Sequence, residues 1–129
     1  MNNLFVPYEQ ALHLKELGFQ EECLAYYHQD QMLEKDSLGI KRDHYRGKFG
    51  VLAPLYQQAF RFFREKYNLC HHIHVNIFKY EWYIEHRIED EEYEGYDYST
   101  YEESELACLK KLIEIAKGKE VAIFCHTNS

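Results

Sequence analysis

The strongest pattern of hydrophobic and polar positions along the chain lies between Pro54 and Tyr67. Its apolar residues follow the i, i+3, i+4, i+7 spacing of one helical face, at Tyr56, Ala59, Phe60, Phe63 and Tyr67. Pro54 suits the first position of a helix, and Asn68 can adopt the left-handed conformation that ends one. Burial of each Phe contributes roughly 1.5–3 kcal/mol, so we expect this helix to be the nucleus of the core.

Two further segments are predicted to be helices from their apolar stripes and end signals. The first covers residues 7–17 and ends at Gly18. The second begins after Thr100, which can form a capping box with Glu103, and ends at the residue before Gly118.

The clearest strand pattern is the alternation of apolar and polar residues over 69–89, which predicts a β-hairpin with one apolar and one polar face. The alternation of the two strands agrees if the turn has four residues, Phe78 to Glu81. In this register His74 lies opposite Glu85 on the polar face.

The remaining stretches have weaker patterns. Residues 23–35 are predicted as two short strands around a polar turn, with a helix as the alternative. Residues 36–50, rich in Gly and charge, and the acidic, Tyr-rich residues 90–99 are predicted as loops. Residues 119–129 form a tail whose apolar run is either a short final strand or a segment that docks on a partner.

The predicted order is therefore α-ββ-α-ββ-α, with the tail as a candidate final strand. Strands joined by hairpins form antiparallel sheets. We therefore predict an α+β fold with a single domain, residues 1–118, in which antiparallel hairpins form a small sheet packed by three helices.

Composition indicates a folded protein with reduced thiols. The 129 residues suffice for one domain, and aromatic residues make up 16% of them, enough for ring burial to offset chain entropy. The four cysteines include no CxxC pair and follow no signal peptide, which predicts free thiols in a cytoplasmic protein. No apolar run approaches the ~20 residues of a membrane helix, so no membrane association is expected.

Charge is distributed unevenly along the chain. The net charge of −7 argues against simple binding to a phosphate backbone. Residues 41–64 nevertheless carry six cations and one acid, whereas residues 85–105 carry ten acids and one cation. A fold that keeps these segments apart would present two faces of opposite sign.

Three segments taken together resemble a known group of proteins. They are FVPYEQA with LKELGF in 5–19, PLYQQAFR with FREKY in 54–67, and YEE with ELACLKKLI in 101–113. In combination they resemble a family of small uncharacterised proteins of phages, prophages and mobile elements of gut bacteria. The resemblance covers most of the chain except 35–48 and the tail. It implies a phage-related, intracellular setting, and it transfers no catalytic residues because that family has no assigned activity.

The polar face of the 69–89 hairpin carries the best candidate for chemistry. Cys70, His72 and His74 project from one side of a strand, and Glu85 is expected beside them. Thiolate, imidazole and carboxylate groups are the ligands that zinc binds. A metal-dependent or thiol enzyme built on these four residues is the alternative hypothesis, and a solvated polar sheet face is the simpler interpretation.

The leading hypothesis is a non-catalytic binding protein that needs no cofactor and acts through a protein partner. The sequence contains no convergent set of nucleophile, base and metal ligands, whereas the acidic loop offers carboxylates together with aromatic rings. The candidate contact residues are Glu91, Glu92, Tyr93, Tyr96 and Tyr98. A homodimer through the hairpin edge or the tail is an open alternative, as is a merely solvated loop.

A third hypothesis is an accessory protein that contacts nucleic acid through the basic segment. The candidate residues are Lys41, Arg42, Arg46, Lys48, Arg61 and Arg64. Cations beside aromatic rings can hold a single strand. The net acidity of the chain argues against this hypothesis.

Overall fold

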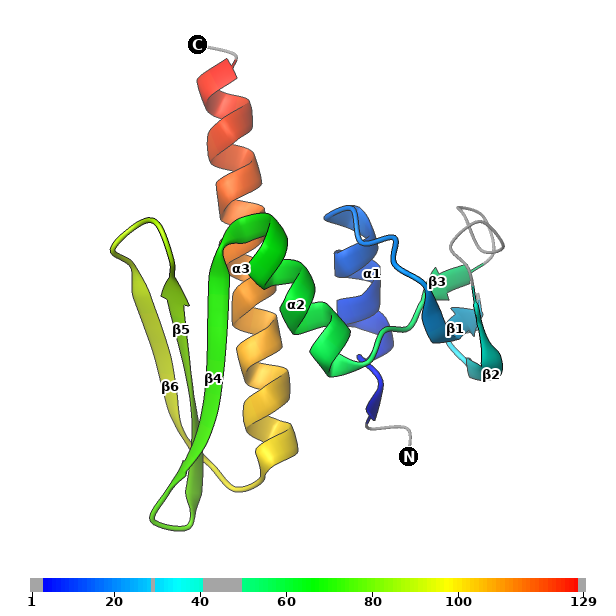
Figure 1. Ribbon diagram of the computed structural model, residues 1–129, viewed down its shortest axis with the longest axis horizontal. Coiled ribbons are helices and arrows are strands. Elements are labelled where there is room, and N and C mark those ends of the chain that lie inside the picture. The colour runs from blue at the N-terminus through cyan, green and yellow to red at the C-terminus, as the bar shows by residue number, and fades with distance from the viewer. Residues whose placement is uncertain (1–3, 29, 41–49, 128–129) are drawn as a thin grey trace. The chain divides into compact units, whose positions relative to one another are not determined.

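The computed structural model describes residues 4–28, 30–40 and 50–127, without the side chains of 36–40 and 121–127. Within these residues the fold is α+β, as predicted, with three helices and two antiparallel sheets of three strands (Figure 1). The structure thus has two separate sheets where a single sheet was predicted. The contacts of the chain cluster into two compact units, Met1–Ala59 and Phe60–Ser129. The boundary falls inside helix α2 (Tyr56–Tyr67).

The first unit is a small sheet with one helix. Its elements are α1 (Tyr8–Glu16), β1 (Cys23–His28), β2 (Leu33–Ile40) and β3 (Gly50–Leu52), and the strand order is β2-β1-β3. Helix α1 ends as predicted, because Gly18 has φ 98° and the Phe19 N–H donates to the Leu14 carbonyl at 2.9 Å. The phenol of Tyr27 donates to the Val6 carbonyl at 2.6 Å and ties the start of the chain to the sheet.

The predicted hairpin over 23–35 is confirmed, and the helical alternative is wrong. The turn closes through the His28 N–H, which donates to the Met32 carbonyl at 3.0 Å, and Gln31 takes the left-handed conformation. The loop predicted for 36–50 is too long, because β2 continues to Ile40 and β3 begins at Gly50. Pairing with β1 from both sides extends these strands beyond what their own sequence indicates. Residues 41–49 lie outside the described residues.

The second unit contains the end of α2 and the sheet β4-β5-β6, on which α3 packs. The elements after α2 are β4 (Leu69–Asn76), β5 (Lys79–His86), β6 (Glu92–Tyr98) and α3 (Tyr101–Thr127). Its core side chains are buried, and they include Phe63, Leu69, Trp82, Ile84, Leu109 and Leu112. Among the described residues, no helix is both long enough and apolar enough to cross a membrane.

The β4–β5 hairpin forms where predicted, but its turn and register differ. The turn consists of Ile77 and Phe78, and Asn76 pairs with Lys79, so the predicted turn Phe78 to Glu81 is wrong. A two-residue turn lets all eight residues of each strand pair, and this longer ladder outweighs the absence of Gly or Asn from the turn. The register moves by an even number of residues, so each side chain keeps its predicted face.

Two predictions for the end of the chain are also wrong. The acidic stretch predicted as a loop over 90–99 contains β6, which pairs with the central strand β5. Helix α3 does not end before Gly118, and residues 119–127 extend it rather than form a final strand. A single Gly destabilises a helix by only about 1 kcal/mol relative to Ala, which is too little to end a long helix.

The predicted signals at the end of α2 and at the start of α3 are confirmed, but the predicted role of Pro54 is wrong. Helix α2 begins two residues later, at Tyr56, because Leu55 is paired with Phe5 in an isolated bridge. Asn68 follows α2 with φ 59°. At the start of α3, the Glu103 N–H donates to the Thr100 hydroxyl at 3.1 Å. The Glu103 carboxylate accepts the N–H of Ser99 at 3.3 Å rather than that of Thr100, so the returning bond of the predicted capping box is made one residue earlier.

Candidate protein-binding face

The second sheet has one face toward α3 and one polar face, which we call the open face. On the α3 side, the ring of Tyr80 meets that of Tyr101 edge-on at 6.0 Å, and the Lys111 ammonium lies 5.4 Å from the Tyr93 ring. The strand registers and the alternation along β6 place eleven residues on the open face: Cys70, His72, His74, Asn76, Lys79, Glu81, Tyr83, Glu85, Glu92, Glu94 and Tyr96. Lys79, at the end of the face next to the turn, is the one Lys or Arg among these eleven residues.

A close packing contact on the α3 side holds β6 in place. Trp82 lies over Gly95, its partner in the register, and the indole N–H donates to the Tyr98 hydroxyl at 3.1 Å. A Cβ built on Gly95 would overlap the indole atoms Nε1, Cε2 and Cζ2. Glycine is therefore needed at this point, and the tyrosine beyond it anchors the strand.

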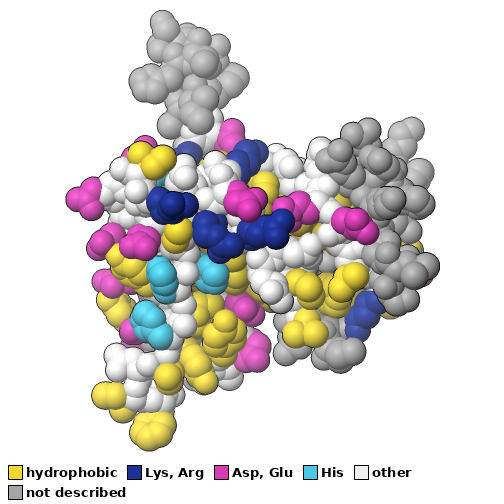
Figure 2. Space-filling view, in the orientation of Figure 1, with side chains coloured by type: hydrophobic (Ala, Val, Ile, Leu, Met, Phe, Trp, Pro, Cys, Tyr) yellow, Lys and Arg dark blue, Asp and Glu magenta, His cyan; other side chains and the backbone are white. Residues whose placement is uncertain are grey.

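Two histidine–glutamate contacts cross from β4 to β5 on the open face. His74 Nε2 lies 2.9 Å from Glu81 Oε1, and His72 Nε2 lies 3.4 Å from Glu85 Oε1. The predicted pairing of His74 with Glu85 is thus replaced by pairing with Glu81, because of the changed register. Figure 2 shows histidine side chains gathered over the strands of this sheet, with acidic side chains near them.

Tyrosine–glutamate contacts cross the other half of the open face. The phenol of Tyr83 donates to Glu92 on the neighbouring strand, and this bond raises the pKa of Tyr83 to about 12. The phenol of Tyr96 donates to Glu94, which likewise raises the pKa of Tyr96. Both phenols therefore stay protonated at neutral pH, and the negative charge of the face comes from its carboxylates.

The structure divides the residues predicted to contact a partner. Glu92 and Tyr96 lie on the open face, whereas Tyr93 and Tyr98 face α3. Glu91 precedes β6, where it accepts the Tyr93 phenol at 2.5 Å and lies 3.7 Å from the Lys119 ammonium.

The open face also contains Glu81, Tyr83 and Glu94, which the sequence prediction did not select as candidate site residues, and Glu85, which it selected only as a metal ligand. The alternation of Glu and Tyr or Gly over 92–95 was the available signal, since it has the period of a strand.

The proposed metal ligands share a face but do not form a metal site. Cys70, His72 and His74 lie on the open face, and Glu85 pairs with Cys70 in the register. Their closest contacts are the two histidine–glutamate pairs described above. Across the described part of the chain, no group of three or more His, Cys, Asp or Glu side chains is arranged to hold a metal ion.

The described thiols differ in their access to solvent. Cys23 and Cys108 are buried, and burial raises the pKa of Cys23 to about 12 and raises that of Cys108 further. Cys70 is partly exposed. Buried thiols that stay protonated are poor nucleophiles, so neither Cys23 nor Cys108 is suited to thiol catalysis.

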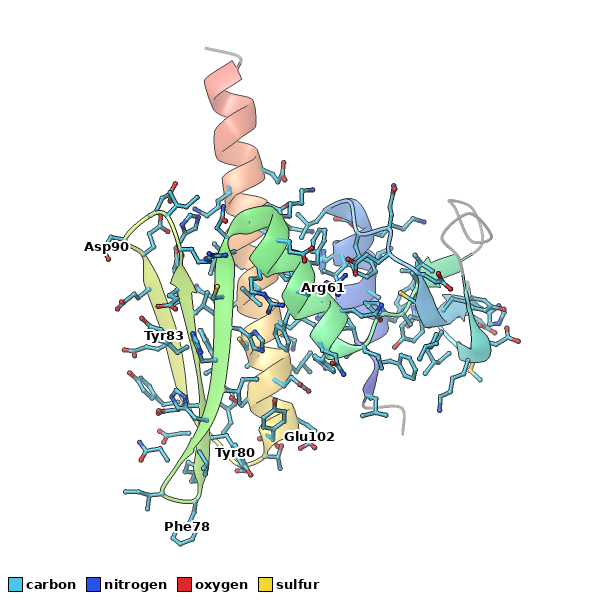
Figure 3. All side chains as sticks on the ribbon, in the orientation of Figure 1. Arg61, Phe78, Tyr80, Tyr83, Asp90 and Glu102 are labelled. Atoms are coloured by element: carbon cyan, nitrogen blue, oxygen red, sulfur yellow. The ribbon has the colours of Figure 1, made fainter. Side chains whose placement is uncertain are left out.

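The basic residues predicted to contact nucleic acid fall largely outside the described residues. Lys41, Arg42, Arg46 and Lys48 belong to 41–49. Of the two on α2, Arg61 lies 3.5 Å from Glu65, one helical turn away. Figure 3 shows Arg61 on this helix. The nucleic-acid hypothesis therefore stays a prediction.

Comparison of the chain with protein-family models, with curated proteins and with solved structures finds no match. The resemblance to phage-type proteins thus stays a prediction, and function has to be argued from the open face itself.

Proposed function

We propose that this protein is a non-catalytic binding protein whose open face contacts a basic surface on a protein partner. One observation supports the proposal above the others: four carboxylates and two phenols project from neighbouring strands, and the strands place a single cation, Lys79 beside the turn, on the same face. They are Glu81, Glu85, Glu92, Glu94, Tyr83 and Tyr96. Carboxylates grouped in this way attract cationic surfaces and accelerate association. Tyrosine adds contact area at a small cost in side-chain entropy.

The binding surface proposed here is not the one predicted from the sequence. The acidic residues act from a paired strand and its neighbour rather than from a loop. A rigid face loses less conformational entropy on binding than a loop does, which favours affinity.

The test compares binding by matched charge variants. Immobilised wild-type protein is used to capture partners from cells that make it, and the captured protein is purified and titrated. We expect Glu92→Gln with Glu94→Gln to weaken binding at least about 10-fold, and wild-type binding to weaken as salt rises. The control, Glu22→Gln with Glu102→Gln, has the same net charge but leaves the open face intact. Equal binding by both double variants would refute the proposal.

A further inference from the structure

The turn of the β4–β5 hairpin exposes more apolar surface than any other turn among the described residues. Phe78 is 91% exposed, Ile77 is 83% exposed, and Val75 on the adjoining strand is 61% exposed. Figure 3 shows Phe78 at the end of the hairpin, at the opposite end of the sheet from Asp90. We call these three residues the apolar tip.

The apolar tip extends past the part of the sheet that other elements cover. The last pair between β5 and β6 is Tyr80 with Tyr98, so Lys79 and the turn are paired only within the hairpin. Tyr80 itself contacts Tyr101 in the first turn of α3. Pairing with β6 and the ring contact with α3 thus end at Tyr80, two residues after Phe78.

The backbone of the tip is strained in a way that its side chains do not relieve. Ile77 and Phe78 both have positive φ, 44° and 67°. A two-residue turn with two positive φ values strongly favours Asn-Gly, and a β-branched residue is poorly suited to it. Exposed apolar side chains at strained positions lower stability without improving the fold, a combination typical of residues retained for function.

The shape and charge of the tip indicate what it would bind. The tip is convex and narrow, so its complement is a concave apolar pocket large enough for one aromatic ring. Three apolar side chains offer little to a lipid bilayer, for which even a single acyl chain gives marginal binding. An anionic membrane would also repel a chain of net charge −7 whose adjacent sheet face is acidic.

We infer that the apolar tip is an anchor that inserts Phe78 into an apolar pocket on a protein partner, with a basic surface beside that pocket. This inference rests on the proposed function, because the basic surface is the one that the open face contacts. Glu81 on that face is three residues after Phe78, so one partner can reach both the tip and the acidic part of the face, with Lys79 between them. An aromatic side chain in a pocket at the centre of an interface is the usual source of most of its affinity.

The first experiment needs no partner. Ile77→Asn combined with Phe78→Gly supplies the residues that the turn favours, so we expect the Tm to rise by roughly 3–8 °C. A lower Tm would overturn the inference, because it would show that the two side chains stabilise the fold.

The second experiment identifies the pocket. Benzoylphenylalanine replaces Phe78 in cells that make the protein, and light then links it to whatever lies against the tip. The linked protein is purified and titrated with wild type and variants. We expect the Asn-Gly variant to bind at least about 30-fold more weakly, equivalent to about 2 kcal/mol at 1.4 kcal/mol per tenfold. The control is Ile88→Asn, since Ile88 is also 77% exposed but lies in the turn between β5 and β6; it should bind as wild type does.

The variants separate failure of this inference from failure of the proposed function. If the Asn-Gly variant binds as tightly as wild type while Glu92→Gln with Glu94→Gln binds weakly, the tip is not an anchor. The open face would still be the surface that binds the partner. If neither change matters, both ideas fail. Absence of any crosslink from position 78 overturns the inference.

Two other occupants of the tip are tested directly. Wild type that sediments with vesicles of phosphatidylcholine and phosphatidylglycerol, while the Asn-Gly variant does not, would make the tip a membrane contact. A wild-type dimer that the Asn-Gly change dissociates would make it a self-association site. Either result overturns the inference.

Discussion

At the scale of single residues, the close contact between Gly95 and Trp82 helps to hold β6 against β5. The indole occupies the space that a side chain at Gly95 would need, and from there it reaches the Tyr98 hydroxyl. A change at Gly95 should therefore be felt by the single Trp of the chain, which is also its fluorescent reporter.

We predict that Gly95→Ala destabilises the protein by about 1–3 kcal/mol, because the new methyl group must displace the indole and break its hydrogen bond. Urea unfolding followed by Trp82 fluorescence measures this. The matched control is Gly118→Ala, which lies in α3 with nothing within 4 Å of its added Cβ. That change should stabilise by up to about 1 kcal/mol. Equal stability of the two variants would contradict the packing described.

Two residues of the second unit should make opposite contributions to the pH dependence of stability. His71 stacks on Phe60 with ring centroids 3.6 Å apart, and its burial lowers its pKa to about 4. Glu105 on α3 is partly buried, and that burial raises its pKa to about 7. The ordinary values are 6.5 and 4.5, so both groups are perturbed over nearly the same range of pH.

In the unfolded chain His71 is protonated below about pH 6.5, whereas in the folded chain it stays neutral down to about pH 4. The contribution of His71 is therefore present above pH 6.5 and is lost as the pH falls toward 4. His71→Phe keeps the stack on Phe60 and removes the titration. We predict that this variant loses less stability than wild type between pH 7 and pH 4.5, as measured by urea unfolding. A loss equal to that of wild type would contradict the shift.

For Glu105, the folded chain holds a proton between about pH 4.5 and pH 7 that the unfolded chain releases. Its contribution is present below pH 4.5 and is lost as the pH rises through 7. Glu105→Gln keeps the neutral shape and removes the titration. We predict that it loses more stability than wild type on acidification over the same interval, the reverse of His71→Phe. If the free energy of unfolding changes with pH in the same way for wild type and Glu105→Gln, the predicted role of Glu105 is wrong.

At the scale of elements, the long helix α3 depends on how it starts. Its first turn is held by two bonds, from the Glu103 N–H to the Thr100 hydroxyl and from the Ser99 N–H to the Glu103 carboxylate. Helix α3 also supplies the buried residues Leu109 and Leu112 that face the second sheet. The start of this helix therefore sets the position of the layer that supports the open face.

We predict that Thr100→Ala destabilises the protein by about 1 kcal/mol, because it removes the acceptor for the Glu103 N–H. Thr100→Ser should retain most of the stability, since its hydroxyl can accept the same bond. Thermal unfolding of both variants measures the difference. If the Ala and Ser variants unfold at the same temperature, the capping bond contributes nothing.

At the scale of the whole molecule, the chain combines a small sheet with one helix and a larger sheet with α3. Each unit has buried side chains of its own, for instance Leu14 in the first and Ile84 in the second. The candidate face and the apolar tip both belong to the second unit, Phe60–Ser129.

We predict that a fragment of residues 54–129, which keeps α2 whole, folds without the first unit. It contains the complete second sheet, α3 and the buried Trp82, although so short a chain buries little surface and should be less stable than the full protein. Native-like Trp82 emission and a cooperative urea transition would confirm this. A fragment with fully exposed Trp emission would show that the two units fold only together.

Local sequence was enough to predict the three helices, the ends of α1 and α2, the start of α3 and the faces of the β4–β5 hairpin. Asn68 and the Thr100–Glu103 pair act within one or two turns of chain, so their neighbours in sequence are also their neighbours in space. The sequence by itself thus determined the α+β class and the polar face that carries His72 and His74.

Tertiary structure alone decided the register, the sixth strand and the composition of the open face. The sequence of β6 has the composition of a loop, and it forms a strand because it pairs with β5. The local sequence does not indicate which strand will be its partner. The turn at Ile77 and Phe78 breaks the local rule for such turns because the paired ladder on either side outweighs its strain. Strand pairing depends on contacts between residues far apart in the sequence. This pairing brings Glu81, Glu92 and Glu94 together on one face.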